Sequence, residues 1–200
     1  MPAPHLLLAS ASPRRRQLLQ GLGVEFSCVA ADIDETPAAR EAPADYVQRM
    51  AQEKARAVAA RPQAQGCLVL GADTTVVVEE DILGKPADHM QGLAMLARLS
   101  GREHQVLTAV CLLGPRGAQT ELVQTAVEFV TLDRATCEAY LATDEPWDKA
   151  GAYAIQGLGG ALVRAIHGSY SNVVGLPLAQ TRALLAANGV VTALDPSAGA

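Results

Sequence analysis

Short apolar runs alternate with helical patterns along this 200-residue chain, and that alternation is the strongest constraint on its fold. Runs such as HLLLA at 5–9 and CLVLGA at 67–72 predict short buried strands. Between them, residues 43–60 carry apolar side chains at helical spacing. No low-complexity linker or internal repeat separates the elements. Interleaved strands and helices of this kind predict a mixed α/β architecture.

Turn residues and helix end signals along the rest of the chain predict further helices and strands. Helices are expected over 14–22, 88–99, 134–142 and 176–187; strands over 25–30, 104–113, 119–132 and 161–166; and a hairpin over 75–83. The length suits one domain, or one domain made of two lobes. We expect that domain to span residues 1–189, with a frayed tail at 190–200.

Composition excludes several classes of protein. Half of the residues are hydrophobic, so the chain can bury a core and is not a disordered protein. Sixteen basic against 21 acidic residues give a net charge of −5, and only 4% of residues are aromatic. A general nucleic-acid binder needs a basic footprint and stacking rings, so a nucleic-acid polymer is not an expected partner.

The four cysteines and the N-terminal segment bear on the compartment. Cys28, Cys67, Cys111 and Cys137 contain no CxxC pair, which favours structural thiols over a zinc or redox site. Leu6–Ala9 is too short for the core of an export signal, and no run approaches the length of a membrane span. We therefore expect a cytoplasmic protein with no membrane partner.

The first candidate site is the segment SASPRRR at 10–16. Ser12 suits an N-cap and Pro13 the first position of a helix. The three arginines Arg14–Arg16 then occupy a first turn where the helix dipole favours acidic side chains. A bound phosphate would account for them, with Ser10 as a further donor. A solvated basic turn is the alternative.

Carboxylates supply the second group of candidates. Asp73 and Thr74 come directly after the apolar run at 67–72, where ligands of α/β proteins gather at strand ends. A carboxylate there can bind a metal or take a proton from water, although a turn aspartate is equally consistent with the pattern. Glu35 belongs to an acidic segment at 32–36 that suits a hard cation but could simply be solvated.

A glycine-rich segment, DKAGAYAIQGLGG at 148–160, completes the candidates. It matches neither GxGxxG nor the GK[ST] ending of a phosphate loop, and alone it is a weak signal. Together the segments resemble the Maf family of nucleoside triphosphate pyrophosphatases over about residues 6–185. The motifs that carry the resemblance are SASPRR (10–15), LGADT (70–74), GKP (84–86), SGREHQVLTAV (100–110), DKAGAYAIQGLGG (148–160) and GSYSNVVGLPL (168–178).

The resemblance implies an elongated α/β fold, similar to inosine triphosphatases, whose two lobes flank a nucleotide cleft. It implies cleavage of a nucleoside triphosphate between the α and β phosphates, with a divalent cation, Mg²⁺ or Mn²⁺, as cofactor and with homodimers as a common state. The family's catalytic base falls on Asp73, and Glu35 and Asp73 are the expected metal contacts. The expected phosphate contacts fall on Ser10, Arg15, Lys54 and Lys85.

Three positions of the family separate its substrate classes. The branch that acts on dTTP and UTP carries Arg, Thr and Gln, and this chain has Arg14, Thr74 and Gln156. The branch that acts on 7-methyl-GTP carries Trp, Gln and Glu instead. A glutamine amide both donates and accepts, as the edge of uracil or thymine requires. The resemblance therefore implies a pyrimidine nucleotide pyrophosphatase that cleans the nucleotide pool.

Two alternatives of other classes stay open at this point. A nucleotide-binding regulator of septum formation during cell division would need no catalysis, although a complete set of catalytic residues argues against pure binding. A phosphatase acting on monophosphates would release inorganic phosphate instead of pyrophosphate. The position of Arg16 departs from close relatives of the pyrimidine branch, and we expect its charge to be solvated.

Overall fold

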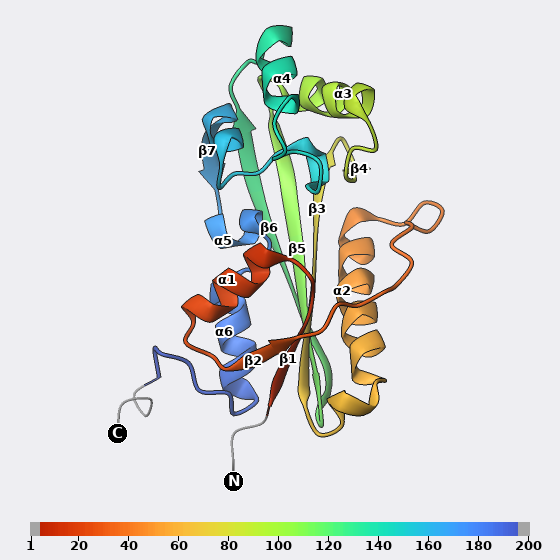
Figure 1. Ribbon diagram of the computed structural model, residues 1–200, viewed down its shortest axis with the longest axis vertical. Helices are drawn as coiled ribbons and strands as arrows, with labels where there is room; N and C mark the ends of the chain where they lie inside the picture. Colours follow the sequence, from red (N-terminus) through yellow and green to blue (C-terminus); the bar gives the residue numbers. More distant parts are fainter. Residues whose placement is uncertain (1–4, 196–200) are drawn as a thin grey trace. The chain divides into compact units, whose positions relative to one another are not determined.

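The computed structural model describes residues 5–195, which form a mixed sheet with helices (Figure 1). The strands are β1 Leu6–Ala9, β2 Phe26–Cys28, β3 Leu68–Val78, β4 Asp81–Leu83, β5 Glu103–Gly114, β6 Gly117–Phe129 and β7 Val163–His167. Their order is β2-β1-β3-β5-β6-β7, with β4 paired to β3. Parallel pairing of β1 with β2 and β3, and antiparallel pairing of β3 with β4 and β6 with β7, confirm the mixed α/β class.

The helices interleave with these strands as the sequence predicts. They are α1 Pro13–Gly21, α2 Pro43–Ala59, α3 His89–Leu99, α4 Arg134–Leu141, α5 Tyr170–Val174 and α6 Leu178–Ala187, with short 3-10 helices at Pro62–Ala64, Ala150–Ala152 and Leu158–Leu162. The predicted start of α1 is confirmed, because Ser12 is its N-cap and accepts a hydrogen bond from the Arg15 amide while Pro13 begins the helix. The short helix α5 lies in a segment for which we expected no element.

The chain divides into two compact units. The first comprises the residues up to Asp73, Thr108–Val123 and the residues from Gly175 onward; the second comprises Thr74–Leu107 and Gln124–Val174. Each unit has its own cluster of buried apolar side chains. Two lobes were expected of a single domain, and the nucleotide cleft between them stays a prediction.

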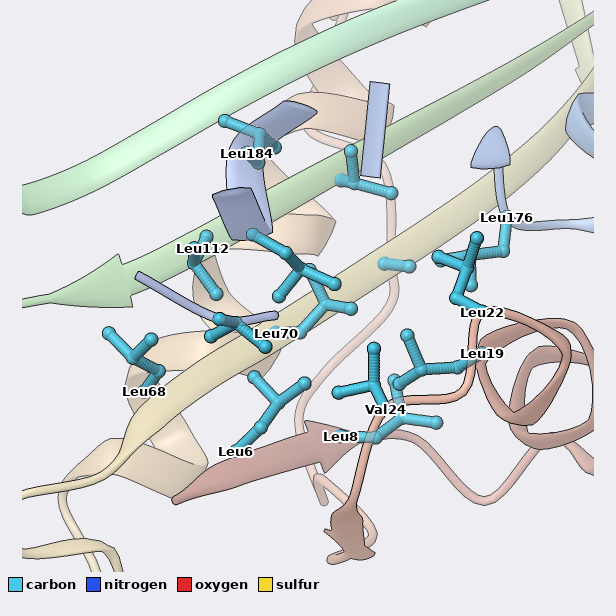
Figure 2. Close-up of a cluster of buried hydrophobic side chains, with 14 residues drawn as sticks. Leu6, Leu8, Leu19, Leu22, Val24, Leu68, Leu70, Leu112, Leu176 and Leu184 are labelled. Atoms are coloured by element: carbon cyan, nitrogen blue, oxygen red, sulfur yellow. The ribbon is translucent and has the colours of Figure 1, made fainter. Parts of the chain in front are cut away.

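The first unit has helices on both faces of its strands. Leu6 and Leu8 of β1 and Leu70 of β3 pack with side chains of α1 and α6 (Figure 2). Because side chains of a strand alternate between faces, Gly71 and Asp73 of β3 lie on the opposite face, against α2. The helix α2 has a marked apolar side, and seven of its residues are buried, Lys54 among them.

The second unit is built around aromatic and aliphatic side chains. Phe129 of β6 meets the rings of His104 and Tyr153 edge-on, with ring centres 5.0 and 4.7 Å away. His104 accepts or donates a hydrogen bond at 2.8 Å to the Tyr153 hydroxyl. Leucines of α3 and α4 pack into the same core. Phe129, Tyr140, Tyr153 and Trp147, four of the seven aromatic residues, belong to this core.

One predicted strand end is wrong, and the error concerns the candidate base. The strand β3 continues without interruption from Leu68 to Val78, so Asp73 lies inside the strand and not in a turn beyond it. The run of Thr and Val at 74–78 favours extended backbone, and a lysine of α2 supplies the partner that a strand aspartate needs. The turn itself follows at Glu79 and Glu80, both at positive φ.

The expected fraying of the C-terminal tail is also wrong for residues 190–195. Val190 and Thr192 are buried, and Arg182 of α6 donates to the Asp195 carboxylate at 2.6 Å. The Ala193 amide donates to the Leu22 carbonyl at 2.8 Å. These bonds hold the segment on the first unit. Residues 196–200 lie outside the described part of the chain.

Two further expectations concern cysteines and membranes. All four cysteines are free thiols; Cys111 and Cys137 are buried, whereas Cys28 and Cys67 are half-buried. Within residues 5–195, none of the helices combines the length and the apolar character that crossing a membrane requires.

Candidate active site

The ammonium group of Lys54 joins two of the predicted carboxylates in the first unit. Lys54 Nζ donates to Asp73 Oδ1 at 2.6 Å and lies 2.8 Å from Glu35 Oε1. The side chains of Lys54 and Asp73 are 10% and 9% exposed, whereas that of Glu35 is 46% exposed. A buried ion pair therefore opens to solvent on the Glu35 side.

The close approach of α2 to β3 places this lysine. A Cβ atom on Gly71 would lie 2.2 Å from the Ala51 carbonyl oxygen and 2.8 Å from the Ala55 amide nitrogen. Only glycine admits the helix backbone at this distance. Lys54 belongs to the same turn of α2, and Asp73 lies two residues beyond Gly71 on the same face of β3. The glycine thus sets the distance that the ion pair spans.

The N-terminal segment adds a serine and an arginine. Ser10 is buried directly after β1, and its Oγ accepts from the Ser12 amide at 3.1 Å. Arg15 donates from Nη1 to the same Oγ at 3.4 Å and from Nε to the Gly175 carbonyl at 2.8 Å. The guanidinium of this residue, which lies in the first turn of α1, is therefore held at two points.

Arg15 is coupled electrostatically to the two carboxylates. Burial lowers the pKa of Arg15, the negative charges of Asp73 and Glu35 raise it, and the neighbouring Arg14 lowers it. These couplings bring Ser10 and Arg15 into one cluster with the lysine and its carboxylates. The phosphate interpretation of the arginine-rich turn fits such a cluster, because a half-buried guanidinium near these carboxylates can also bind an anion whose cation the carboxylates hold.

Two residues of α2 that sequence reasoning missed hold the loop of Glu35. The Tyr46 hydroxyl donates to the Glu35 carbonyl at 2.9 Å, and Arg49 donates to the Thr36 carbonyl at 3.2 Å. Arg49 also binds both oxygens of Glu41, at 2.6 and 2.7 Å, and this contact lowers the pKa of Glu41 to about 2. Tyr46 and Arg49 are three residues apart on the helix, a spacing that could have indicated a shared polar contact.

The other acidic residues of this loop take no part in the cluster. The Asp34 carboxylate accepts from the Thr36 amide at 2.9 Å, which is a local turn contact and lowers the pKa of Asp34. Asp32 is exposed. The interpretation as a solvated acidic loop therefore holds for these two residues, and Glu35 alone turns toward Lys54.

Of the remaining predicted residues, Arg14 is half-buried in α1 of the first unit, and the other three belong to the second unit. Thr74 follows Asp73 in β3, and the alternation of the strand turns its side chain to the opposite face. Lys85 is exposed between β4 and α3, and the Gly151 amide donates to the Gly84 carbonyl at 3.0 Å. Gln156 is exposed within the glycine-rich segment. The GKP turn and this segment are thus joined inside one unit.

The donor set of the cluster suits a cation that arrives with a ligand. Among residues 5–195, no three His, Cys, Asp or Glu side chains gather as a metal centre. Glu35 and Asp73 nevertheless converge on one ammonium group, so two hard oxygen ligands face one point. Magnesium characteristically uses one or two carboxylates and completes its shell with phosphates and water. The pair therefore fits a metal–nucleotide complex better than a resident metal ion.

Comparison with known proteins identifies a family and close relatives. The family model described as Maf-like protein matches residues 5–188. A protein of Myxococcus xanthus named dTTP/UTP pyrophosphatase is 55% identical over 185 residues, which cover 92% of this chain and 93% of that protein. Proteins of the same name from Hahella chejuensis and Shewanella oneidensis are 52% and 51% identical, cover 92% and 94% of this chain, and are matched over 92% and 100% of their own lengths.

A solved structure shows the same fold at much lower identity. The Ham1 protein of Staphylococcus aureus superposes with a TM-score of 0.54 at 14% identity, covering 92% of this chain and 98% of that one. This similarity confirms the predicted fold class.

Proposed function

This chain belongs to the Maf family, and we propose that it hydrolyses dTTP and UTP to the nucleoside monophosphate and pyrophosphate, which cleans the nucleotide pool. The observation that carries the proposal is the cluster in which Lys54 joins Asp73 and Glu35 beside Arg15. Relatives that are at least half identical bear the name of this activity. A cluster equipped for proton transfer favours an enzyme over a regulator that only binds nucleotide.

In the proposed reaction, Asp73 is the general base. The oxygen of a water molecule attacks the α-phosphorus, and its proton passes to the Asp73 carboxylate. The bond between the α-phosphorus and the oxygen that bridges to the β-phosphorus breaks, and pyrophosphate leaves with the bonding electron pair. No covalent intermediate is required. Asp73 suits the role because the strand and the bond to Lys54 hold its carboxylate in place.

Cationic side chains are proposed to bind the triphosphate. Arg15 presents a guanidinium fixed by Ser10 and the Gly175 carbonyl, and guanidinium groups match phosphate oxygens in pairs. Lys54 is proposed to exchange part of its contact with the carboxylates for a phosphate oxygen. Lys85, which is exposed in a short turn, is proposed to supply a further charge to the triphosphate. Positive charge at these points stabilises the charge that develops on the leaving group.

A divalent cation, Mg²⁺ or Mn²⁺, is proposed to be held by Glu35 and Asp73. When bound, such a cation neutralises phosphate charge and polarises the phosphorus–oxygen bonds. Glu35 is suited to the role because its carboxylate is partly open to solvent, while Tyr46 and Arg49 hold the backbone beside it.

Selection of the base is proposed to rest on Arg14, Thr74 and Gln156. The exposed Gln156 amide can donate to the O4 atom of thymine or uracil and accept from N3–H. Cytosine presents the opposite pattern at these two atoms, so the same amide orientation rejects it. Nucleotide pools also fit the cytoplasmic location expected from the sequence, and a homodimer stays a proposal that size-exclusion chromatography with light scattering would test.

The decisive test is release of pyrophosphate by the purified protein from a panel of dTTP, UTP, dCTP and 7-methyl-GTP, with Mg²⁺ or Mn²⁺. We expect turnover of dTTP and UTP, and we expect Asp73→Asn to reduce kcat about 10²- to 10⁴-fold because it keeps the shape but removes the base. Asp32→Asn is the matched control, since it makes the same change of charge at an exposed residue outside the cluster.

Three results would contradict the proposal. Turnover of 7-methyl-GTP without dTTP or UTP would refute the substrate class. Near-normal kcat in Asp73→Asn would refute the assignment of the base. Release of inorganic phosphate instead of pyrophosphate would indicate the phosphatase alternative.

A further inference from the structure

A single carboxylate binds two backbone amides that follow shortly after Gln156. Glu145, between α4 and the glycine-rich segment, accepts from the Leu158 amide at 2.8 Å through Oε2. Its Oε1 accepts from the Gly159 amide at 2.9 Å. Each carboxylate oxygen thus accepts a hydrogen bond from one of two consecutive N–H groups, which lie two and three residues beyond Gln156. Hydrogen bonds of amides to an ionised acceptor are stronger than those to a neutral one.

A buried tyrosine extends this contact to the residues before Gln156. The Tyr140 hydroxyl donates to Glu145 Oε1 at 2.8 Å and accepts from the Ala154 amide at 3.1 Å. Tyr140 lies in α4 and is only 5% exposed, so its ring is fixed by the core of the second unit. The backbone on both sides of Gln156 is therefore tied to one pair of side chains.

Two glycines leave room for the side chains of Glu145 and Tyr140, because a glycine has no Cβ atom. A Cβ atom on Gly157 would lie 2.1 Å from Glu145 Oε2, and one on Gly159 would lie 2.6 Å from the Tyr140 hydroxyl oxygen. At both positions a side chain would displace the anchor. Gly157 and Gly159 thus reflect close approach to Glu145 and Tyr140, and they do not require a phosphate loop.

Gln156 itself is exposed while the backbone around it is fixed. Fixing the backbone in advance reduces the entropy that a side chain loses when it binds a ligand, and it sets the direction of the amide. We infer that Glu145, supported by Tyr140, is the positioning residue that aims the Gln156 amide and so sets the selection between pyrimidine bases. This inference rests on the proposed function, because it assigns the base-reading role to Gln156.

The carboxylate form is essential to this contact. Burial raises the pKa of Glu145, but the bonds from Gly159, Tyr140 and Leu158 outweigh it and lower the pKa below its ordinary value. A glutamine at this position would turn an NH₂ group toward one of the two backbone N–H groups, and two donors cannot bond each other. Glu145→Gln therefore breaks one of the two hydrogen bonds to the backbone amides of Leu158 and Gly159, at nearly constant side-chain volume.

The test compares kcat/KM for dTTP and dCTP in matched variants. We expect Glu145→Gln to lower the dTTP/dCTP ratio about fivefold to tenfold, chiefly through KM, with kcat changed about twofold or less. Gly157→Ala is expected to do the same, because its methyl group displaces the carboxylate without altering charge. Asp144→Asn is the control, since it neutralises an exposed carboxylate next to Glu145.

A double-mutant cycle with Gln156→Ala decides whether Glu145 acts through Gln156. If it does, Glu145→Gln lowers the ratio in the wild-type background and leaves it unchanged in the Gln156→Ala background. An equal effect in both backgrounds, or none in either, overturns the positioning role and leaves the proposed function intact. If Gln156→Ala keeps the wild-type dTTP/dCTP ratio of kcat/KM, Gln156 does not select the base, and this inference is overturned as well.

Amide hydrogen exchange supplies a readout that does not depend on activity. In Glu145→Gln, exchange at Leu158 and Gly159 is expected to accelerate relative to the rest of the second unit. Unchanged protection at both amides would overturn the anchor. Should Glu145→Gln fail to fold, Gly157→Ala carries both the exchange and the kinetic comparison, because it leaves Glu145 charged and able to turn outward to solvent.

Discussion

Replacement of Lys54 by methionine removes the cation that two carboxylates share while keeping a side chain of similar length. Lys54 and Asp73 are 10% and 9% exposed, so their contact at 2.6 Å is a buried ion pair. Removal of one partner from such a pair leaves a buried charge and costs about 3–5 kcal/mol. The contact with Glu35 adds about 1 kcal/mol or less, because that carboxylate is 46% exposed and screened by solvent.

The assay is urea unfolding at pH 7, followed by both far-UV circular dichroism and the fluorescence of Trp147, the single tryptophan. Coincident transitions with an unchanged slope m report the loss of stability directly. For a chain of this size, the expected loss lowers the melting temperature by about 6–20 °C. Arg56→Met on the same helix is the control, and because Arg56 is exposed it should cost about 0.5 kcal/mol or less.

The double variant Lys54→Met/Asp73→Asn tests the reason for the loss. Without either charge, no ion is left buried, so most of the stability should return. If the stability of Lys54→Met lies within about 1 kcal/mol of that of the wild type, the ion pair is solvated and the reasoning from a buried charge is refuted. If the double variant is as unstable as Lys54→Met, the loss of stability comes from packing of the lysine stem and not from the buried Asp73 charge that Lys54→Met leaves unpaired.

Further predictions concern packing and pH. Gly71→Ala should destabilise by about 1–3 kcal/mol or more, because its Cβ would lie 2.2 Å from the Ala51 carbonyl and α2 must move; Gly21→Ala, which meets nothing within 4 Å, should be nearly neutral in the same urea assay. Burial lowers the pKa of His104 to about 4 from its ordinary 6.5, so the unfolded state binds more protons between these values. Stability should therefore fall by about 3 kcal/mol as pH drops through this window. His104→Phe should remove that part of the pH profile, and an unchanged profile would contradict it.

Local chemistry made much of the fold predictable. Ser12 and Pro13 mark the start of α1 because a cap and a missing amide act within one turn of helix. The apolar runs marked β1 and the first half of β3, and the periodic pattern of α2 was correct to one residue at its end. Such signals depend only on neighbours in the chain, so a single sequence carries them.

The errors occur where a distant partner decides the local structure. Asp73 resembled a turn residue, because a strand interior rarely accepts a carboxylate, but Lys54 on α2 satisfies it there. The tail at 190–195 resembled a frayed end, yet Arg182 holds it through Asp195. Neither partner is near its carboxylate in the sequence, so no local pattern could indicate the contact.

The candidate site divides in the same way. The sequence by itself determined the family, the fold class and the residue types of the site, because ordered motifs and hydrophobic periodicity are written along the chain. Only the tertiary structure decided that one ammonium group joins Glu35 to Asp73, and that Glu145 holds the backbone beside Gln156. The physical reason is range: helix caps and strand patterns act over a few residues, whereas ion pairs and hydrogen bonds act between atoms that folding brings within 3 Å.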